Sequence, residues 1–339
     1  MPTLYLTKER SRASLTGERL HVEIESDTAG QKPTIRDIPF HEIERLFVEE
    51  NSSLSTPALC ECLRREIPIT YIARDIGPIL GQAVPVSMNC EARMQQYKLC
   101  TQPEFALAFA ISVIDAKIAN SRRVLQRLGS NRPQNDTSLK FTLDCMENDR
   151  KAVLKATNLD AVRGHEGVAA GRYFEAYAKF YPPDHPFERR SRRPPHNVAN
   201  SVMSFAYSLL VQESVSAIYA SGLDPCLGFL HQPQDGRASL ALDMIEPFRA
   251  PVGDALAIDL ISHAVIKASE HTNCQNGGVY LNRDGRLRFY YAYERRMDRE
   301  FTSEQTGLRT TLRREIQRMA LSVKASITRG EILDPFIMN

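Results

Sequence analysis

Residues 84–89 read VPVSMN, and they separate two parts of the chain with different sequence patterns. Before them, short apolar runs are divided by Gly, Asp, Asn and Ser, which is typical of strands joined by turns. After them, apolar residues recur at helical spacing almost to the end of the 339 residues. A chain of this length is expected to form about two domains. The sequence therefore predicts an α+β fold with a small N-terminal β-rich domain over residues 1–86 and a larger, all-α helical domain over residues 87–339.

The N-terminal part is predicted to contain strands and one helix. Residues 20–24 alternate apolar and polar side chains, the pattern of a half-buried strand. Further apolar runs at residues 4–6, 45–48 and 67–72 are expected as strands. Thr56 is expected to cap a helix that continues to Arg65, with Pro57 in its first turn.

The second part is predicted as a bundle of helices with one long loop. Apolar-periodic segments cover residues 105–128 and 200–219, Thr157 and Asp160 resemble a capping box, and a last apolar stripe runs from Leu312 to Val323. Residues 181–195 read YPPDHPFERRSRRPP, and so many prolines exclude a helix there. Its arginines form a cationic cluster that is either a solvated loop or a phosphate grip: Arg189, Arg190, Arg192 and Arg193.

Bulk composition excludes several classes of protein. Hydrophobic residues make up 42% and charged residues 25%, which is ordinary for a globular protein, and the net charge of +2 does not by itself indicate nucleic-acid binding. The N-terminus has no signal-peptide pattern, and no run of about 18 apolar residues predicts a membrane span. The seven cysteines include no CxxC pair and are expected to be reduced. We therefore expect a cytoplasmic protein that does not enter a membrane.

Three stretches of the helical part carry His or acidic residues that could converge. Glu166 lies among small residues, and His231 ends an apolar run before a turn. Asp243 and Glu246 are three apart, so on a helix they would share one face and could hold one cation together. Taken singly, each residue has an ordinary structural explanation, as an ion-paired or boundary residue. Together they suit a divalent ion: the oxygens favour Mg²⁺ or Mn²⁺, and the imidazole favours Mn²⁺.

Motifs along the chain decide between these explanations. From residue 4 to about residue 329 the sequence resembles the CRISPR-associated integrase family, the endonuclease known as CRISPR-associated protein 1, which is the integrase subunit of the adaptation machinery. The resemblance rests on residues 38–46, 54–59, 163–167, 172–174, 192–195, 200–210, 222–231 and 240–249. It implies that Glu166, His231 and Glu246 bind one divalent ion, Mn²⁺ or Mg²⁺, and that Asp243 supports the site. The chain departs from the family pattern at Asn197-Val198 and at Pro247, where relatives often carry Asp-Pro and a second Glu.

The resemblance also implies an activity and partners. The helical domain would be the catalytic domain of a metal-dependent DNA endonuclease and integrase. It would insert short foreign DNA fragments into the CRISPR array through attack of a 3′-hydroxyl on a phosphodiester. We expect a homodimer, a small ferredoxin-like partner protein, and double-stranded DNA as both the captured fragment and the target array. The residues expected to contact DNA are Arg163, Arg189, Arg190, Arg192, Arg193, Asn200 and Arg249.

Two other functions remain open at this point. A transposon-type integrase or a nuclease of branched DNA would carry the same metal site, but such transposon enzymes tend to have an extra DNA-binding tail, and this chain ends at Asn339 soon after its last expected helix. A non-catalytic DNA scaffold is disfavoured because the four acidic and His positions are intact. No Walker A motif is found, in agreement with a reaction that needs no ATP.

Overall fold

A computed structural model of the chain describes residues 3–7, 11–25, 32–74, 79–85, 89–130 and 137–339. The chain divides into two compact units, Met1–Ser87 and Met88–Asn339. The boundary predicted at residue 86 falls on residues 86–88, which lie outside the described residues. The first unit is rich in strands and the second is mainly helical, so the predicted α+β fold class is confirmed.

The N-terminal unit contains two four-stranded sheets. In one sheet three parallel strands are followed by an antiparallel fourth, in the order β1 (Thr3–Leu6), β5 (Arg45–Glu49), β7 (Ile69–Ile72) and β8 (Ile79–Ala83). The other sheet is an antiparallel meander with a short strand parallel to β2 at one edge, in the order β4 (Thr34–Pro39), β3 (Arg19–Ile24), β2 (Ser11–Thr16) and β6 (Ser53–Leu54).

One hydrophobic core joins both sheets to the one α-helix found among the described residues of this unit. Leu20 and Leu46, from different sheets, are fully buried, and Cys62 of α1 (Thr56–Arg64) packs with them. The helix begins one residue earlier than its expected cap implies, because the Ser55 hydroxyl, not that of Thr56, accepts the backbone N–H of Ala58 at 3.4 Å.

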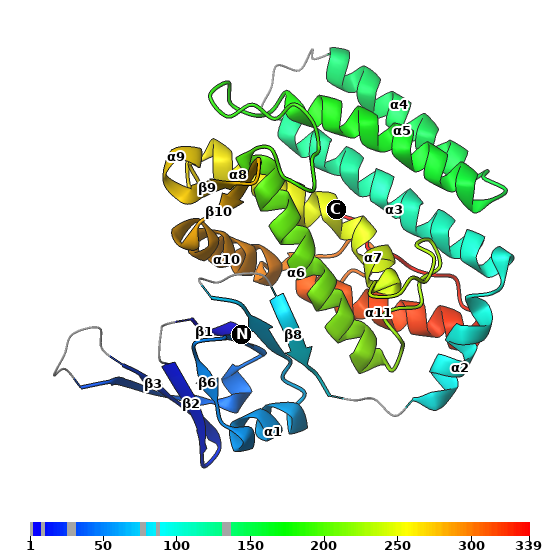
Figure 1. Cartoon of the computed structure of the whole chain (residues 1–339). Helices are drawn as coiled ribbons and strands as arrows, with labels where there is room; N and C mark the ends of the chain where they lie inside the picture. The colour runs from blue at the N-terminus through cyan, green and yellow to red at the C-terminus, as the bar shows by residue number, and fades with distance from the viewer. Residues whose placement is uncertain (1–2, 8–10, 26–31, 75–78, 86–88, 131–136) are drawn as a thin grey trace. The chain divides into compact units, whose positions relative to one another are not determined.

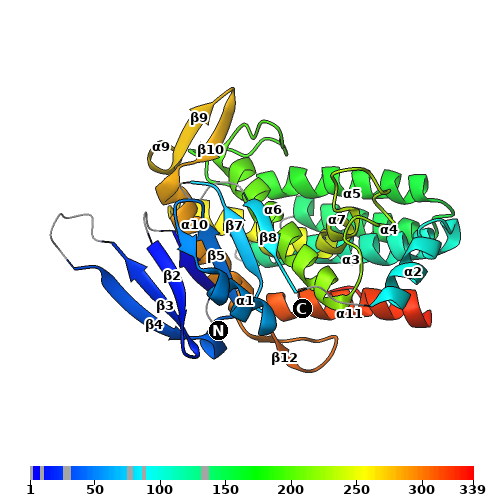
Figure 2. The same cartoon turned by 60° about the horizontal axis from the view of Figure 1, so that its bottom comes forward.

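After a first helix, α2 (Cys90–Leu99), the C-terminal unit forms a layer of three long helices. The helices α3 (Pro103–Gly129), α4 (Thr137–Val153) and α5 (Leu159–Ala178) pack against one another and run side by side (Figures 1 and 2). The predicted capping box of α5 is shifted by one residue, since the Asn158 side chain accepts the Ala161 N–H at 2.9 Å. This layer supplies one wall of the candidate site.

Another long helix, α6 (Val198–Ser221), forms the centre of the unit and is buried along most of its length. It packs against α7 (Ser239–Ile245), the π-helical turn η3 (Arg249–Asp254), α8 (Ala255–Ser262) and α11 (Leu312–Arg329) (Figure 1). Between α7 and η3 lies a 3₁₀ turn, η2 (Glu246–Phe248). The chain therefore turns a corner immediately after α7, where Pro247 prevents normal helical bonding.

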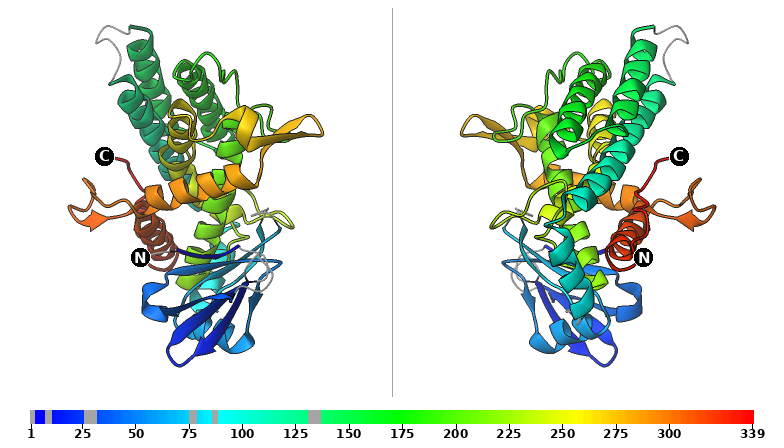
Figure 3. Two further views of the ribbon diagram at one scale, coloured as in Figure 1. Left: turned by 90° about the vertical axis from the view of Figure 1, so that its left-hand side faces the viewer. Right: turned by 90° about the vertical axis from the view of Figure 1, so that its right-hand side faces the viewer.

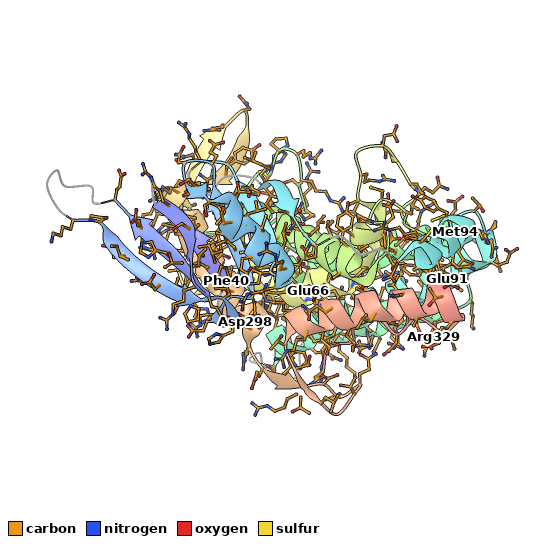
Figure 4. The ribbon with its side chains drawn as sticks, turned by 90° about the horizontal axis from the view of Figure 1, so that it is seen from below. Phe40, Glu66, Glu91, Met94, Asp298 and Arg329 are labelled. Atoms are coloured by element: carbon orange, nitrogen blue, oxygen red, sulfur yellow. The ribbon has the colours of Figure 1, made fainter. Side chains whose placement is uncertain are left out.

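α11 also carries a buried charge that its apolar stripe does not predict. Arg313 is buried, and its guanidinium donates to Glu213 of α6 at 2.8 Å and to two acids of α10 (Arg283–Asp298), Glu294 at 2.7 Å and Asp298 at 2.9 Å. Three carboxylates compensate one buried cation, which fixes these helices to one another. The far end of α11, at Arg329, lies beside α2 (Cys90–Leu99), which carries Glu91 and Met94 (Figure 4).

The sequence analysis predicted an all-α domain over residues 87–339, but the second unit also contains short strands. After the short helix α9 (Ala268–His271), β9 (Thr272–Gln275) and β10 (Gly278–Leu281) form one hairpin, and β11 (Phe301–Thr302) and β12 (Arg309–Thr310) form another. Both project from the helices (Figure 3). Strands this short carry too little periodicity to be predicted.

Among the described residues, no single helix has both the length and the apolar composition needed to cross a membrane. The pair α2 and α3, bent by 97°, meets that test only when its two helices are taken together.

Candidate active site

The two acids Glu166 and Glu246 come together around a lysine. Glu166 projects from the middle of α5, and Glu246 begins η2. Lys117 of α3 donates to Glu166 Oε1 at 2.5 Å, and its Nζ lies 2.7 Å from Glu246 Oε2. Three elements distant in sequence thus place two carboxylates on one cationic nitrogen. The structure therefore brings these two predicted ligands together, around a lysine that no sequence motif indicated.

Charge controls the ionisation of this cluster. Burial alone would raise the pKa of Glu246, but the positive charges of Arg249 and Lys117 outweigh it and lower the pKa to about 2. Burial likewise acts to lower the pKa of Lys117, yet Glu246 and Glu166 raise it. Arg249 Nε lies 3.1 Å from Glu246 Oε2. Glu246 is therefore ionised, which is the state in which a carboxylate binds a metal ion.

His231 is held by a second acid. Asp243, fully buried on α7, accepts the backbone N–H groups of Phe229, Leu230 and His231 at 2.7–3.0 Å, and its Oδ1 lies 2.6 Å from Nδ1 of the His231 ring. Burial raises the pKa of Asp243, while the bond to His231 acts to lower it. An imidazole that gives its Nδ1–H to a carboxylate presents Nε2 as a lone-pair donor, the usual state of a metal-binding histidine.

Gly228 makes this loop possible. A Cβ atom built on Gly228 would lie 2.7 Å from the carbonyl oxygen of His231 and 2.8 Å from Asp243 Oδ2. No larger residue fits without moving the backbone. The stretch that precedes His231 in the sequence is therefore shaped to wrap around the Asp243 carboxylate.

The spacing of Asp243 and Glu246 suggested that both could hold one cation, but the structure turns their carboxylates to different partners. The carboxylate of Asp243 points to the His231 loop, whereas that of Glu246 points to Lys117. The α-helix ends at Ile245, and the change to 3₁₀ geometry at Glu246 turns the two side chains towards different partners. The supporting position of Asp243 agrees with the role that the family resemblance implied.

Arg163, expected to contact DNA, links α5 to the histidine loop, and its predicted DNA contact stays a prediction. Its guanidinium donates to the backbone oxygen of Leu230 at 2.8 Å and to Asp160 at 3.0 Å. Because Arg163 precedes Glu166 by one helical turn, this bond fixes the distance between the helix of Glu166 and the loop of His231.

Beside the Glu166–Lys117 pair lies a small cavity of about 70 Å³ with basic and aromatic walls. Arg190, Arg192 and Arg249 line it, together with Tyr207. The guanidinium carbons of Arg190 and Arg249 lie 5.3 and 4.7 Å from the centroid of the Tyr207 ring, within the range of cation–π contacts. The cavity therefore offers positive charge next to the carboxylates.

A buried acid, Asp254, also lines this cavity. It accepts hydroxyl hydrogen bonds from Tyr173 of α5, at 2.9 Å, and from Tyr207 of α6, and its backbone oxygen accepts the hydroxyl of Tyr177 at 2.6 Å. Burial raises the pKa of Asp254 to about 6, although the bonds from Tyr207 and Tyr173 act to lower it. This network joins α5, α6 and η3 and was not predicted.

The arginine loop is only partly a free surface. Arg189, Arg192 and Arg193 are exposed, whereas Arg190 turns inward and donates to Asn200 Oδ1 at 2.9 Å and to Ser204 at 3.0 Å. Asn200, predicted as a DNA contact, is fully buried. Its amide is occupied by the loop itself, including the backbone oxygen of Arg189 at 2.9 Å and the N–H of Ser191 at 2.8 Å. Asn200 thus shapes the loop and cannot touch a ligand directly.

The donor chemistry of Glu166, Glu246 and His231 fits a divalent ion. Two carboxylates surround one positive charge, and the imidazole is oriented by a buried acid, which is the arrangement found behind metal-binding histidines. Within the described part of the chain, however, no group of three or more His, Cys, Asp or Glu side chains is placed so that it could hold a metal ion. The complete set of three ligands therefore stays a prediction.

Comparisons with known proteins agree with the resemblance seen in the motifs. The model of the family described as "CRISPR associated protein Cas1" matches residues 4–295. A "CRISPR-associated exonuclease Cas4/endonuclease Cas1 fusion" of Geobacter sulfurreducens is 34% identical over 88% of this chain, which spans 53% of the fusion protein. "CRISPR-associated endonuclease Cas1 1" of Chlorobaculum tepidum is 30% identical over 90% of this chain and 89% of its own length.

Solved structures share the fold. A casposase bound to its integration product aligns with a TM-score of 0.82 at 22% identity, covering 98% of this chain and 92% of the casposase. A Cas1 protein from Thermotoga maritima aligns with a TM-score of 0.78 at 22% identity, over 99% of this chain and all (100%) of that protein. The chain also matches 36% of a polypeptide in a Cas6-RT-Cas1–Cas2 complex, at a TM-score of 0.76 and 23% identity.

Proposed function

This chain belongs to the family of CRISPR associated protein Cas1, and we propose that it is a divalent-metal-dependent DNA endonuclease and integrase of CRISPR adaptation. Its substrates would be a short captured DNA duplex and the CRISPR array. The reaction would join a 3′-hydroxyl of the fragment to a phosphodiester of the array. The relatives named as Cas1 endonucleases support the nuclease chemistry, and the site supplies the residues.

The observation that carries this proposal is the convergence of Glu166 and Glu246 on one cationic point, with His231 oriented nearby by Asp243. Such a set of side chains would hold Mn²⁺ or Mg²⁺ through Glu166, His231 and Glu246. A bound ion would supply charge neutralisation at the phosphate and a lower pKa for the attacking hydroxyl.

The chain's own residues would orient the reacting groups. In the exchange, the 3′-hydroxyl of the fragment gives up its proton as its oxygen bonds to the phosphorus. The old bond from the phosphorus to the 3′-oxygen of the target strand breaks, and that oxygen takes up a proton in turn. Arg190, Arg192 and Arg249 line the cavity beside Glu166, where their charges would bind phosphate oxygens. Because one phosphodiester replaces another, no nucleotide cofactor is required.

The proposal is tested by joining a labelled duplex to a supercoiled plasmid in the presence of Mn²⁺. Glu166→Gln should abolish joining, because it removes one charged ligand. Glu175→Gln is the matched control, since Glu175 is an exposed residue of the same helix. Wild-type joining rates in Glu166→Gln would rule the proposed site out. The same assay with EDTA tests whether a divalent ion is needed at all.

The exposed arginines Arg189, Arg192 and Arg193 are proposed to grip the DNA backbone. Replacing all three by Gln should reduce the slope of log binding constant against log salt concentration, since each phosphate contact contributes roughly one unit. Arg190 is left unchanged, because it is part of the loop structure. An unchanged slope would mean that these arginines are only solvated.

We further propose that the protein acts as a homodimer with a small ferredoxin-like partner. The name of one structural neighbour, a Cas6-RT-Cas1–Cas2 complex, supports the expectation of a partner protein. The mass of the purified protein from light scattering, alone and with the candidate partner, checks both expectations.

A transposon-type integrase is the second candidate, and the match to a casposase favours it at the level of fold. The two functions differ in target choice. A CRISPR integrase should join short fragments of any sequence preferentially at the border of a repeat array, whereas a transposon-type integrase should join the ends of its own element and show no preference for the array. Sequencing of the joined products distinguishes them.

A further inference from the structure

Lys117 is the residue at the candidate site that neither the motifs nor the comparisons assign. It lies in the middle of α3, a helix of 27 residues whose inner face is apolar. Only 19% of its side chain is exposed. Its ammonium contacts Glu166 at 2.5 Å and Glu246 at 2.7 Å, the same two acids that are proposed to bind the ion.

Electrostatics explain why a cation stands there. Two carboxylates brought this close repel each other unless a positive charge lies between them. Arg249 pairs with Glu246, but its guanidinium is stacked 4.7 Å from the Tyr207 ring, and no contact with Glu166 is seen. Lys117 is therefore the group that compensates both acids at once.

Lysine also has the mobility that this position requires. Its ammonium is a compact charge on a flexible stem of four carbons, whereas a guanidinium stacked on an aromatic ring is held in place. Lys117 lines the cavity of about 70 Å³ that also contains Arg192. The side chain thus has adjoining space into which it can withdraw while its backbone stays fixed in α3.

We propose that Lys117 is a built-in competitor of the divalent ion. Its ammonium holds Glu166 and Glu246 together before the ion binds, and it leaves them when the ion takes its place. The inference rests on the proposed function, because it concerns the same site. Lys117 would therefore stabilise the pair of acids in the metal-free protein and, by the same contacts, lower the affinity of the site for the ion.

The test is a titration of the full-length protein with Mn²⁺ in the absence of DNA, with free Mn²⁺ followed by its electron paramagnetic resonance signal. Lys117→Met keeps the length of the side chain and removes its charge. It should bind Mn²⁺ about tenfold or more tightly than the wild type, since a charge-assisted contact is lost from the competing state. Lys140→Met, an exposed position on α4, is the control and should bind as the wild type does.

A second variant and a second readout guard against misfolding. Lys117→Arg keeps the charge but replaces the compact ammonium with a fork that binds two carboxylates well, so it should bind Mn²⁺ no more tightly than the wild type. In thermal melting, Lys117→Met should be less stable than the wild type without Mn²⁺ and should gain more stability from added Mn²⁺. Glu246→Gln in either background should remove the binding, which identifies the site.

The outcomes separate this inference from the proposed function. Equal or weaker Mn²⁺ binding by Lys117→Met, with clear binding by the wild type, would overturn the competitor role and leave the metal-dependent function intact. If neither protein binds Mn²⁺ or Mg²⁺, the metal site itself is wrong, and the role of Lys117 falls with it.

Discussion

Glu246 and Asp254 are both buried acids of the short segment between α7 and α8, and their surroundings shift their pKa values in opposite directions. Around Glu246 the charges of Arg249 and Lys117 overcome the effect of burial and lower its pKa to about 2. Around Asp254 burial dominates over the bonds from Tyr207 and Tyr173 and raises the pKa to about 6. One acid is therefore ionised throughout the physiological range, whereas the other titrates near its lower edge.

The difference indicates two kinds of task. An acid that is paired with a mobile lysine can exchange that cation for another, which suits the binding of a metal ion. An acid held by neutral hydroxyl groups from two helices, Tyr173 on α5 and Tyr207 on α6, exchanges nothing and joins the elements around it. We therefore propose a metal-binding role for Glu246 and a structural role for Asp254, and each role can be tested by a separate substitution.

The largest expected effect comes from replacing each acid by its amide. Glu246→Gln should reduce the rate of strand joining more than about 100-fold, because loss of a ligand should exceed the 10–100-fold effect of losing a supporting partner. Asp254→Asn should reduce it less than about tenfold, because no reacting group is removed. The measurement is the initial rate of joining of a labelled duplex with Mn²⁺, after circular dichroism has shown that both variants are folded. Equal losses in the two variants would erase the distinction between them.

The next effect is on stability and distinguishes the two acids by pH. The folded-state pKa of Asp254, about 6, lies above its ordinary value of 3.8. Between these values the folded protein keeps a proton that the unfolded chain has lost, so this carboxyl makes the free energy of unfolding fall as pH rises from about 4 to about 6. A shift of about two pKa units corresponds to at most about 3 kcal/mol. Asp254→Asn lacks this term.

Urea unfolding at pH 4.5, 5.5 and 6.5 measures this contribution of Asp254 to the free energy of unfolding. The free energy of unfolding of Asp254→Asn minus that of the wild type should become more positive with each step upwards. Glu246→Gln should show a much smaller trend of opposite sign, because folded Glu246 is ionised throughout this window, whereas the unfolded chain, with the ordinary pKa of 4.5, takes up protons only at its acidic end. Parallel curves for Asp254→Asn and the wild type would mean that Asp254 titrates normally.

A smaller loss is expected one step away from the proposed ion. Asp243→Asn keeps the size of the side chain but puts an amide where a carboxylate accepts three backbone N–H groups and the His231 ring. The orientation of His231 should suffer, with a loss of joining of about 10- to 100-fold. Asp235→Asn, an exposed neighbour in the same loop region, serves as the control. Wild-type rates in Asp243→Asn would show that His231 needs no orientation or takes no part.

Parts of this site could be predicted and parts could not, for a physical reason. Short motifs single out Glu166, His231 and Glu246 in the sequence, and the structure brings Glu166 and Glu246 to one lysine. Lys117 was hidden, since a single lysine in an apolar-periodic segment gives no signal of its own, and its partner Glu166 lies 49 residues away. The tyrosines of Asp254 come from separate helices in the same way.

The fold follows the same rule. The strand β3 and the helices α3 and α6 have strong periodicity, and β5 is an apolar run; all four were predicted close to their observed bounds. The apolar stripe predicted from Leu312 to Val323 covers the first part of α11, which continues to Arg329. β4 was missed because its residues are mostly exposed and carry no alternating apolar pattern. β2 was missed because the side chains it buries at Ser11 and Ala13 are small. Packing between distant segments decides such elements, and spacing along the chain does not record it.

The smallest effect on activity should come from the residue that lies between the two acids. The Tyr207 hydroxyl bonds Asp254, whereas its ring supports Arg249, which in turn pairs with Glu246. Tyr207→Phe removes only the hydroxyl, so it should lower the free energy of unfolding by about 1.5 kcal/mol and change the joining rate less than about threefold. Tyr207→Leu removes the ring as well, and the loss of a cation–π contact of about 1–2 kcal/mol should slow joining about tenfold. If Tyr207→Phe slowed joining as much as Tyr207→Leu, Asp254 would act on the chemistry through this hydroxyl, and the separation of the two acids would have to be given up.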